Sequence, residues 1–457
     1  MPIATAEQLH NYLSLFDDLR TRTQHQPLWL RELRERAFAT FWEKGFPSTR
    51  DEDWRFTNVN LIARTRFTPA RDVRQQVSSD SLEGFRIPGA ACQLVFVNGV
   101  FASELSDFAT LPAGVEVRSL SQEIMAQGQT IERHLGRYLN TERDAFSALN
   151  TSFIEEGAYV YLPRRTVVER PICLLFVAVP GETPEMAHLR NLIVAEDESE
   201  ATIVEDYVTL GSGSGFSNAV TELAAGENAT LAHHLIERES VSAINVSTLS
   251  MHQARNANLS SHSVLLGGRL VRNNVHPVLG GEGGECLING LFIGAGEQHM
   301  DNYMLVEHAS PRCSSRQFYN GILDGQSHGV FHGRIIVHKD AQKTDAKQTN
   351  RNLLLSDQAQ IDTKPQLEIY ADDVKCTHGA TIGQVEENAL FYLRSRGVDE
   401  ISARRLLLLA FANECLERMR NQPVREYLKT AVQDWLPLST AKTTRATAVE
   451  RRWEEVG

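Results

Sequence analysis

RNANLS, residues 255–260, is one of four stretches that repeat the same phrase, a polar turn followed by a small residue and an apolar strand. The other three stretches are DESEATI (197–203), GENATL (226–231) and EGGECLI (282–288). The copies are equally spaced when they are aligned on Ala201, Ala229, Ala257 and Glu285. Weaker copies of the phrase follow at GQSHGVF and DQAQID. Their anchors, His328 and Ala359, lie at longer spacings than the first four anchors.

A fixed period in a strand-rich region predicts a stack of similar rungs, because one rung cannot bury its apolar face without a neighbour to cover it. Residues 158–395 fit this picture, since short alternating segments are separated there by Gly, Asn, Asp and Ser. We therefore expect a parallel β-helix. A β-sandwich with regularly spaced turns is the alternative.

Helical patterns flank this β region. LWLRELRERAFATFW (28–42) has apolar residues at helical spacing until Gly45, and the Asn98-Gly99 dipeptide between two apolar runs predicts a β-hairpin. Asp399 is the expected N-cap of a C-terminal helix. The expected fold is mainly β with helical ends, divided into a mostly helical region with a hairpin (1–156), the β-helix core (157–395), a helical domain (396–437) and a polar tail (438–457).

The charge and the cysteines limit the function classes. A net charge of −12 argues against a nucleic-acid partner, because such binding depends on clustered Lys and Arg. The apolar runs are shorter than the roughly 20 residues that cross a bilayer, and no secretion signal is visible at the N-terminus. Six well-separated cysteines fit reduced thiols, so we expect a cytoplasmic protein that binds neither nucleic acid nor membrane.

Catalytic motifs are missing from the sequence. No Gly-Lys pair occurs, so the chain lacks a phosphate loop and is not expected to hydrolyse ATP by itself. In GSGSGFS (211–217) the position of a nucleophilic serine is taken by Gly213. His328, His332 and His338 lie in one β stretch but have no carboxylate at a ligand spacing, so we interpret them as exposed or core histidines.

YADDVKCTHGATIG, residues 370–383, carries the most suggestive chemistry. If it is a strand, Cys376 and His378 point to the same face, together with Asp372 and Val374. That face could be a metal site, a catalytic face or the edge of a core. One thiol and one imidazole do not complete a cluster site, which normally takes four thiolates or close substitutes. From residue types alone, a packed cysteine beside a histidine bonded to backbone is the favoured interpretation.

Several longer segments resemble one family. Two segments closely resemble the SufB/SufD family of the SUF iron–sulfur cluster assembly scaffold, and within it the SufD type. They are QKTDAKQTNRNLLLSDQAQIDTKPQLEIYADDVKCTHGATIGQ (342–384) and LFYLRSRGV (390–398). Further agreement comes from four segments spread over the chain, namely DEDWRFTNV (51–59), SVLLGG (263–268), CSSRQFYNGIL (313–323) and AFANE (410–414).

This resemblance implies a right-handed parallel β-helix and two partners. SufD-type chains pair with SufB through the late core strands, and their C-terminal helices hold one copy of the SufC ATPase. The striped helices over 399–436 would then be the docking platform, with Leu408, Ala412, Val424 and Leu428 as the residues at their core. A homodimer is a further expectation for the chain when it is alone, because an exposed strand edge that pairs with a paralogue can also pair with itself.

The resemblance also implies a shared cluster-assembly site. His378 occupies the place of the functional histidine and is the expected metal ligand, Cys376 matches as well, and SufB would supply a cysteine and a glutamate from across the interface. Where SufB carries its cysteine, this chain has Asn350, Arg351 and Asn352. We therefore expect no cofactor bound stably by the isolated chain, a transient iron–sulfur cluster shared with SufB, and room for a flavin in the complex.

The expected function is thus a non-catalytic scaffold subunit for de novo iron–sulfur cluster assembly and iron acquisition. The competing hypothesis is a β-helix enzyme of the carbohydrate lyase or esterase type. Such enzymes usually need exposed carboxylates with aromatic platforms and are often exported, whereas only 7% of this chain is aromatic.

Overall fold

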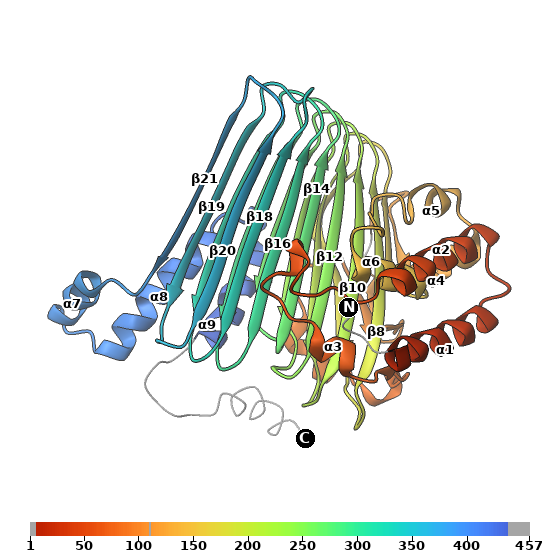
Figure 1. Cartoon of the computed structure of the whole chain (residues 1–457), viewed down its shortest axis with the longest axis horizontal. Coiled ribbons are helices and arrows are strands. Elements are labelled where there is room, and N and C mark those ends of the chain that lie inside the picture. Colours follow the sequence, from red (N-terminus) through yellow and green to blue (C-terminus); the bar gives the residue numbers. More distant parts are fainter. Residues whose placement is uncertain (1–5, 109–110, 437–457) are drawn as a thin grey trace.

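Two long parallel sheets form one solenoid in the computed structural model, which describes residues 6–108 and 111–436 (Figure 1). From β6 onward successive strands alternate between the sheets, so each of these strands pairs in parallel with the strand two positions away along the chain. This is the predicted parallel β-helix, and it excludes the β-sandwich.

The two sheets are named A and B. Sheet A contains β1 (Thr68–Pro69), β5 (Glu116–Ser119), β6 (Ala158–Leu162), β8 (Glu185–Ala195), β10 (Gly215–Ala225), β12 (Ile244–Gln253), β14 (Leu270–Leu279), β16 (His299–His308), β18 (His328–Val337) and β20 (Gln360–Ile369). Sheet B contains β2 (Cys92–Val97), β3 (Val100–Phe101), β4 (Asp107–Phe108), β7 (Val167–Ala178), β9 (Glu200–Thr209), β11 (Thr230–Arg238), β13 (Asn258–Leu265), β15 (Glu285–Gly294), β17 (Ser314–Leu323), β19 (Asp345–Leu354) and β21 (Lys375–Gly383).

A left-handed turn residue marks each rung and explains the repeated phrase. In the four repeated stretches it is Glu198, Asn228, Asn256 and Gly283, all with φ between 53° and 73°. The amide of Asn228 donates to the carbonyl of Arg255, and the amide of Asn256 donates to that of Glu282, both at 2.9 Å. Backbone hydrogen bonds therefore connect the corners of neighbouring rungs. Asn and Gly recur at these corners because they tolerate a left-handed backbone conformation.

The expectation of one constant period is wrong, although the rungs are real. In sheet B the strand partners of Thr230 are Glu200 before it and Asn258 after it, and the next partner beyond Asn258 is Glu285. The sequence separation between partners shortens at each of these steps. The left-handed turn residues shift by the same steps as the strand partners, so turn and strand stay in register and the differences in length lie in the other connections of each rung. The weaker copy at His328 begins β18 and so belongs to the opposite sheet.

The helices of the N-terminal region pack on the outer face of sheet A, whereas its segment 73–85 packs on sheet B. The region contains short helical turns (η1, Glu52–Trp54; η2, Arg74–Gln76; η3, Asp80–Phe85) and the helices α1 (Ala6–Arg22), α2 (Leu28–Lys44), α3 (Asn60–Arg64), α4 (Leu120–Ala126), α5 (Gln129–His134) and α6 (Ala145–Ser152). The helix expected over 28–42 is α2, and Gly45 with φ of 66° follows its end. The hairpin is also confirmed, since β2 and β3 are antiparallel around Asn98 and Gly99.

Buried ion pairs fix this region to the sheet. Arg190 on β8 pairs with Glu222 on β10, and Arg272 on β14 pairs with Asp301 on β16. The guanidinium of Arg272 lies 3.9 Å from the ring centre of Trp54, in the η1 turn. Each charge is compensated and hydrogen-bonded, as burial requires.

The C-terminal helices α8 (Glu400–Leu416) and α9 (Gln422–Trp435) cover the outer face of sheet B, with which they share an apolar cluster. The helix before them, α7 (Glu387–Ser395), packs against α8 and projects beyond β21 (Figure 1). Asp399 caps α8 by accepting from the Ser402 amide at 3.0 Å, as expected. Because α7 begins at Glu387, helix starts inside the range 157–395 that was expected to be β-helix. The tail at 438–457 lies outside the described residues.

No helix in the described ranges combines the length and the apolar character that a membrane span requires.

The role of the left-handed turn residues can be tested directly at Asn256. Asn256→Val should lower the free energy of unfolding by about 1–2 kcal/mol, because a β-branched residue is strained at positive φ. Asn256→Gly is the matched control, since it removes the same side chain but tolerates the turn. Thermal unfolding of the purified chain measures both variants, and equal melting temperatures for Val and Gly would contradict the account.

Candidate functional site at the open end of the solenoid

The last rung of the solenoid has no neighbour beyond it in the described part of the chain. Among those residues β21 pairs only with β19, and β20 pairs only with β18 (Figure 1). Along β21 every residue is exposed apart from Cys376, which is half-buried, whereas most of β17 is buried. The inner face of the last rung is therefore open, and we call it the open end.

Cys376 and His378 both face the axis of the solenoid. In the ladder Cys376 lies beside Ala346 and His378 lies beside Gln348, and the side chains of these two β19 residues are buried. Cys376 also packs against the interior apolar cluster, as does Val374. The strand begins at Lys375 rather than at Tyr370, so Asp372 lies before it in a bend. Alternation then places Ala380 and Ile382 on the same face as His378.

The chemistry of this face is incomplete. Burial raises the pKa of the Cys376 thiol, and the hydrogen bond from the Ala346 backbone lowers it by less. The described part of the chain contains no group of three or more His, Cys, Asp or Glu side chains that could hold a metal ion. Cys376 and His378 therefore offer one soft sulfur and one imidazole nitrogen, and further ligands would have to come from outside the described part of this chain.

The backbone of β21 is also unpaired on one side. The Lys375 amide donates to the Thr344 carbonyl at 2.8 Å, so the odd-numbered residues of β21 face β19. The amides and carbonyls of Cys376, His378, Ala380 and Ile382 consequently face the free edge. These are the same residues whose side chains face the open end, so a strand added here would lie directly beside the thiol and the imidazole.

The free edge of β20 differs from that of β21. The amide of Gln360 donates to Ser327 and that of Tyr370 to Val337, both at 2.9 Å, so even-numbered residues face β18. Pro365 therefore belongs to the row that faces the free edge, where its missing N–H disrupts no bond within this chain. Because Pro365 interrupts the donors of β20, β21 offers the more complete edge to a partner strand.

The segment Asn350, Arg351 and Asn352 carries no thiol and is used for structure. Asn350 and Asn352 are buried and hydrogen-bonded to each other at 2.6 Å. Arg351 points to the opposite face of β19, where it pairs with Glu414 of α8 and lies over the Phe411 ring. This segment therefore joins the last rungs to α8.

The residues expected at the docking platform lie inside the protein. Leu408, Ala412, Val424 and Leu428 are buried in the cluster that α8 and α9 form with sheet B. They can support a docking surface but cannot touch a partner. The exposed apolar residues of the C-terminal helices are instead Phe391 (74% exposed), Tyr392 (59%), Ile401 (53%) and Leu406 (50%). The apolar stripe in the sequence of the C-terminal helices correctly indicated their buried face. It gave no information about which apolar residues are exposed on the opposite face.

The three histidines of the stretch 328–338 each have a separate hydrogen-bond partner. His328 bonds Asp362 at 2.8 Å, His332 bonds Gln366 at 2.7 Å and His338 bonds Glu307 at 3.3 Å. Each ring thus has its own acceptor, and the sequence interpretation of separate histidines holds.

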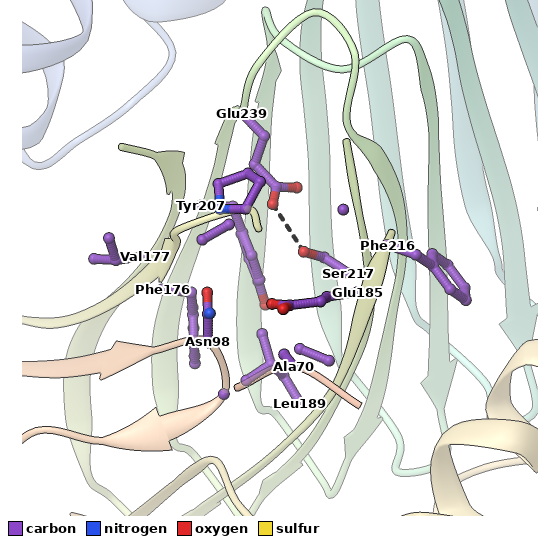
Figure 2. A pocket seen from close by; sticks show the side chains of 15 residues that line it. Ala70, Asn98, Phe176, Val177, Glu185, Leu189, Tyr207, Phe216, Ser217 and Glu239 are labelled. Carbon is purple, nitrogen blue, oxygen red and sulfur yellow. Dashed lines mark hydrogen bonds between the residues drawn. The ribbon is translucent and has the colours of Figure 1, made fainter. Parts of the chain in front are cut away.

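A cavity of about 30 Å³ lies elsewhere, near the first rungs (Figure 2). Its carboxylates are engaged, because Glu239 accepts from Ser217 at 2.8 Å and Glu185 pairs with Arg71. Burial raises the pKa of Glu239 to about 7. No Cys or His lines this cavity, which makes it a poor site for iron and sulfide.

Comparison with known proteins agrees with this architecture. The chain matches the SufBD core domain of the SUF system for FeS cluster assembly over residues 177–411, and the SufBD N-terminal region over residues 6–174. It is 36% identical to an iron–sulfur cluster assembly SufBD family protein of Synechocystis over 82% of this chain and 84% of that protein.

Two relatives carry the SufD name. The chain is 31% identical to the iron–sulfur cluster assembly protein SufD of Escherichia coli, over 86% of this chain and 90% of that protein. It is 24% identical to SufD of Bacillus subtilis, over 92% of this chain and 96% of that protein. The rungs, the open end and these matches together show that the chain belongs to the SufB/SufD family of iron–sulfur cluster assembly proteins and is of the SufD type.

Proposed function

We propose that this chain is a non-catalytic scaffold subunit that completes a cluster-assembly site together with SufB at the open end. The observation that carries the proposal is the coincidence of two soft ligands and an unpaired backbone edge on the same residues of β21. Iron and sulfide are the cargo of this site. Cys376 and His378 supply part of the ligand set, and the partner supplies the rest.

An incomplete site suits assembly and release. A thiolate and an imidazole bind iron, yet ligands divided between two chains can separate when the interface moves. Exposed apolar side chains at the open end, Ile369, Tyr370 and Ile382, give a partner apolar surface to bury. A second copy of this chain could use the same edge, and a mass measurement with and without SufB separates the homodimer from the heterodimer.

The role of His378 is tested in the assembled complex. The chain is purified with SufB and SufC and reconstituted anaerobically with iron and sulfide. His378→Ala should reduce cluster formation, measured by absorbance and by iron and sulfide content, because it removes a ligand. Thr377→Ala is the matched control on the neighbouring position, which faces away from the axis. Cluster formation by His378→Ala at the level of the control would rule out this role.

The role of the free edge is tested separately with proline. Ala380→Pro removes an amide that faces away from β19, so the isolated chain should keep its stability while association with SufB weakens by about tenfold or more. Thr381→Pro removes an amide that faces β19 and should destabilise the isolated chain instead. Association is measured by titrating SufB, and unchanged affinity for Ala380→Pro would show that pairing does not use this edge.

We also propose that SufC docks on the exposed apolar residues of α7 and α8, above the buried stripe. An ATPase partner that binds one conformation of the complex more tightly when it holds nucleotide could shift the complex between conformations. This chain has no phosphate loop and cannot supply that energy itself. Cytoplasmic localisation and a flavin in the assembled complex are further proposals of the same kind. The alternative of a carbohydrate lyase or esterase would be supported by turnover with the isolated chain, and no residue cluster described above favours it.

The docking surface is tested by Leu406→Asp, which places a charge among exposed apolar residues and should weaken SufC binding without unfolding the chain. Val241→Asp is the matched control, because Val241 is exposed to the same degree (52% against 50%) in a turn that belongs to neither α7 nor α8. Co-purification with SufC and titration measure the effect. Equal retention of SufC by the two variants would place the docking surface elsewhere.

A further inference from the structure

The two strands of the open end are held in different ways. On β20, four side chains of the outer face are hydrogen-bonded to other elements. The four bonds are Asp362 with His328 at 2.8 Å, Lys364 with Glu52 at 2.9 Å, Gln366 with His332 at 2.7 Å and Glu368 with Arg334 at 2.6 Å. β20 is therefore fixed both to β18 and, through the η1 turn, to the N-terminal region.

The side chains of β21 form almost no such bonds. None of them forms an ion pair with a described residue, and the Cys376 thiol is the only one hydrogen-bonded to such a residue, through the Ala346 backbone. The outer face is exposed throughout 375–383, so no element covers it. The strand is held mainly by its backbone ladder with β19, to which the Asn352 side chain adds a bond to the Thr381 carbonyl at 3.4 Å.

Gly379 weakens the middle of β21. Its φ lies outside the left-handed region, and a Cβ at this position would meet no atom within 4 Å. Neither a turn nor a close contact therefore requires a glycine here, and the same is true of Gly383. A glycine within a strand lowers the stability of the strand, because it loses more conformational freedom on folding and has no side chain to pack.

The surface beneath β21 is largely polar. On the inner face of β19, the side chains under β21 include Gln348, Asn350 and Asn352, each at most 2% exposed. The same face of β15 instead carries Ile288 and Phe292, which belong to the interior apolar cluster. Uncovering amide side chains costs less free energy than uncovering apolar ones, since water can replace their hydrogen bonds. β21 can therefore separate at a lower cost than an inner strand.

Both ends of β21 are attached to the rest of the protein. Before the strand, the Lys343 amide donates to the Asp373 carbonyl at 2.7 Å, and the side chains of these two residues form an ion pair. After it, Val385 packs against the apolar cluster that α8 and α9 form with sheet B. Residues 375–383 thus lie between two attachment points, and we call this segment the strap.

We propose that the strap separates from β19 as one unit while β20 and the rest of the solenoid stay folded. Segments with few buried apolar contacts and exposed backbone hydrogen bonds open at a lower free energy than the whole protein unfolds. This opening depends on the present chain alone. The strap closes when a partner strand pairs with its free edge, and this second step rests on the function proposed above. Cys376 and His378 then reach fixed positions only in the assembled complex.

The opening is tested by amide hydrogen exchange of the isolated full chain, followed by mass spectrometry of overlapping peptides. After correction for intrinsic rates, the strap amides that bond to β19 should exchange about tenfold or more faster than the β20 amides that bond to β18. β20 is the matched control, because it is the other strand with a free edge at the open end. Equal protection of the two strands, or fast exchange confined to the ends of the strap, overturns the proposal.

Gly379→Val tests the cause of the opening. A β-branched residue favours the extended backbone, and its Cβ meets no atom within 4 Å at this position. Exchange throughout the strap should therefore slow by about threefold or more, while exchange in β20 stays the same. Unchanged exchange in the strap, or an equal change in β20, contradicts opening of the strap as one unit.

Addition of SufB tests the closure. When a mass measurement confirms that SufB is bound, exchange in the strap should become as slow as in β20. Exchange that stays fast in the bound complex overturns the closure. The exchange of the isolated chain involves neither SufB nor a cluster, so failure of the opening is distinguished from failure of the proposed function, which His378→Ala tests.

Discussion

A rung of a β-helix is stable only if another rung covers its inner face and pairs with its edge, and every part of this protein can be related to that requirement. In the middle of the solenoid each rung meets it through its neighbours, with backbone ladders along the strands and left-handed turn residues at the corners. The problem is confined to the two ends. At the first rungs the β2–β3 hairpin folds back, and Phe101 packs against the interior cluster.

At the last rung the described part of the chain provides no comparable cover. The sequence instead places there a cysteine, a histidine and an unbroken row of backbone donors and acceptors, all on one strand. Under the function proposed above, this open rung, which would be a defect in an isolated fold, is the location of the chemistry. The incomplete ligand set is consistent with that proposal, since a shared site requires that neither chain hold all the ligands.

Polar interactions decide where the helical ends lie on the solenoid. Arg190 with Glu222 and Arg272 with Asp301 join neighbouring strands beneath the N-terminal region, and Arg238 with Asp206 and Tyr427 joins sheet B to α9. Burying charge is favourable only with compensation, so such pairs specify position more than they add stability. The apolar clusters then supply most of the stabilisation of each interface.

Local signals in the sequence predicted local features well. The turn residues Asn228 and Asn256, the hairpin at Asn98-Gly99 and the cap at Asp399 depend on backbone preferences of single residues, and the structure contains all of them. The shared face of Cys376 and His378 followed from alternation alone. The constant rung length was wrong because turns of different length are not encoded in strand pattern. The exposed face of α7 depends on tertiary packing, so no sequence pattern indicated it.

The proline at position 365 has a consequence for the cell. A solenoid that ends in two open edges is a template on which a second copy of the chain could pair, and a residue without an amide hydrogen in one of those edges limits such self-pairing. The other edge has no such safeguard over 375–383. Production of this chain in step with its partner would keep that edge occupied, whereas an excess of this chain would leave a surface prone to self-association.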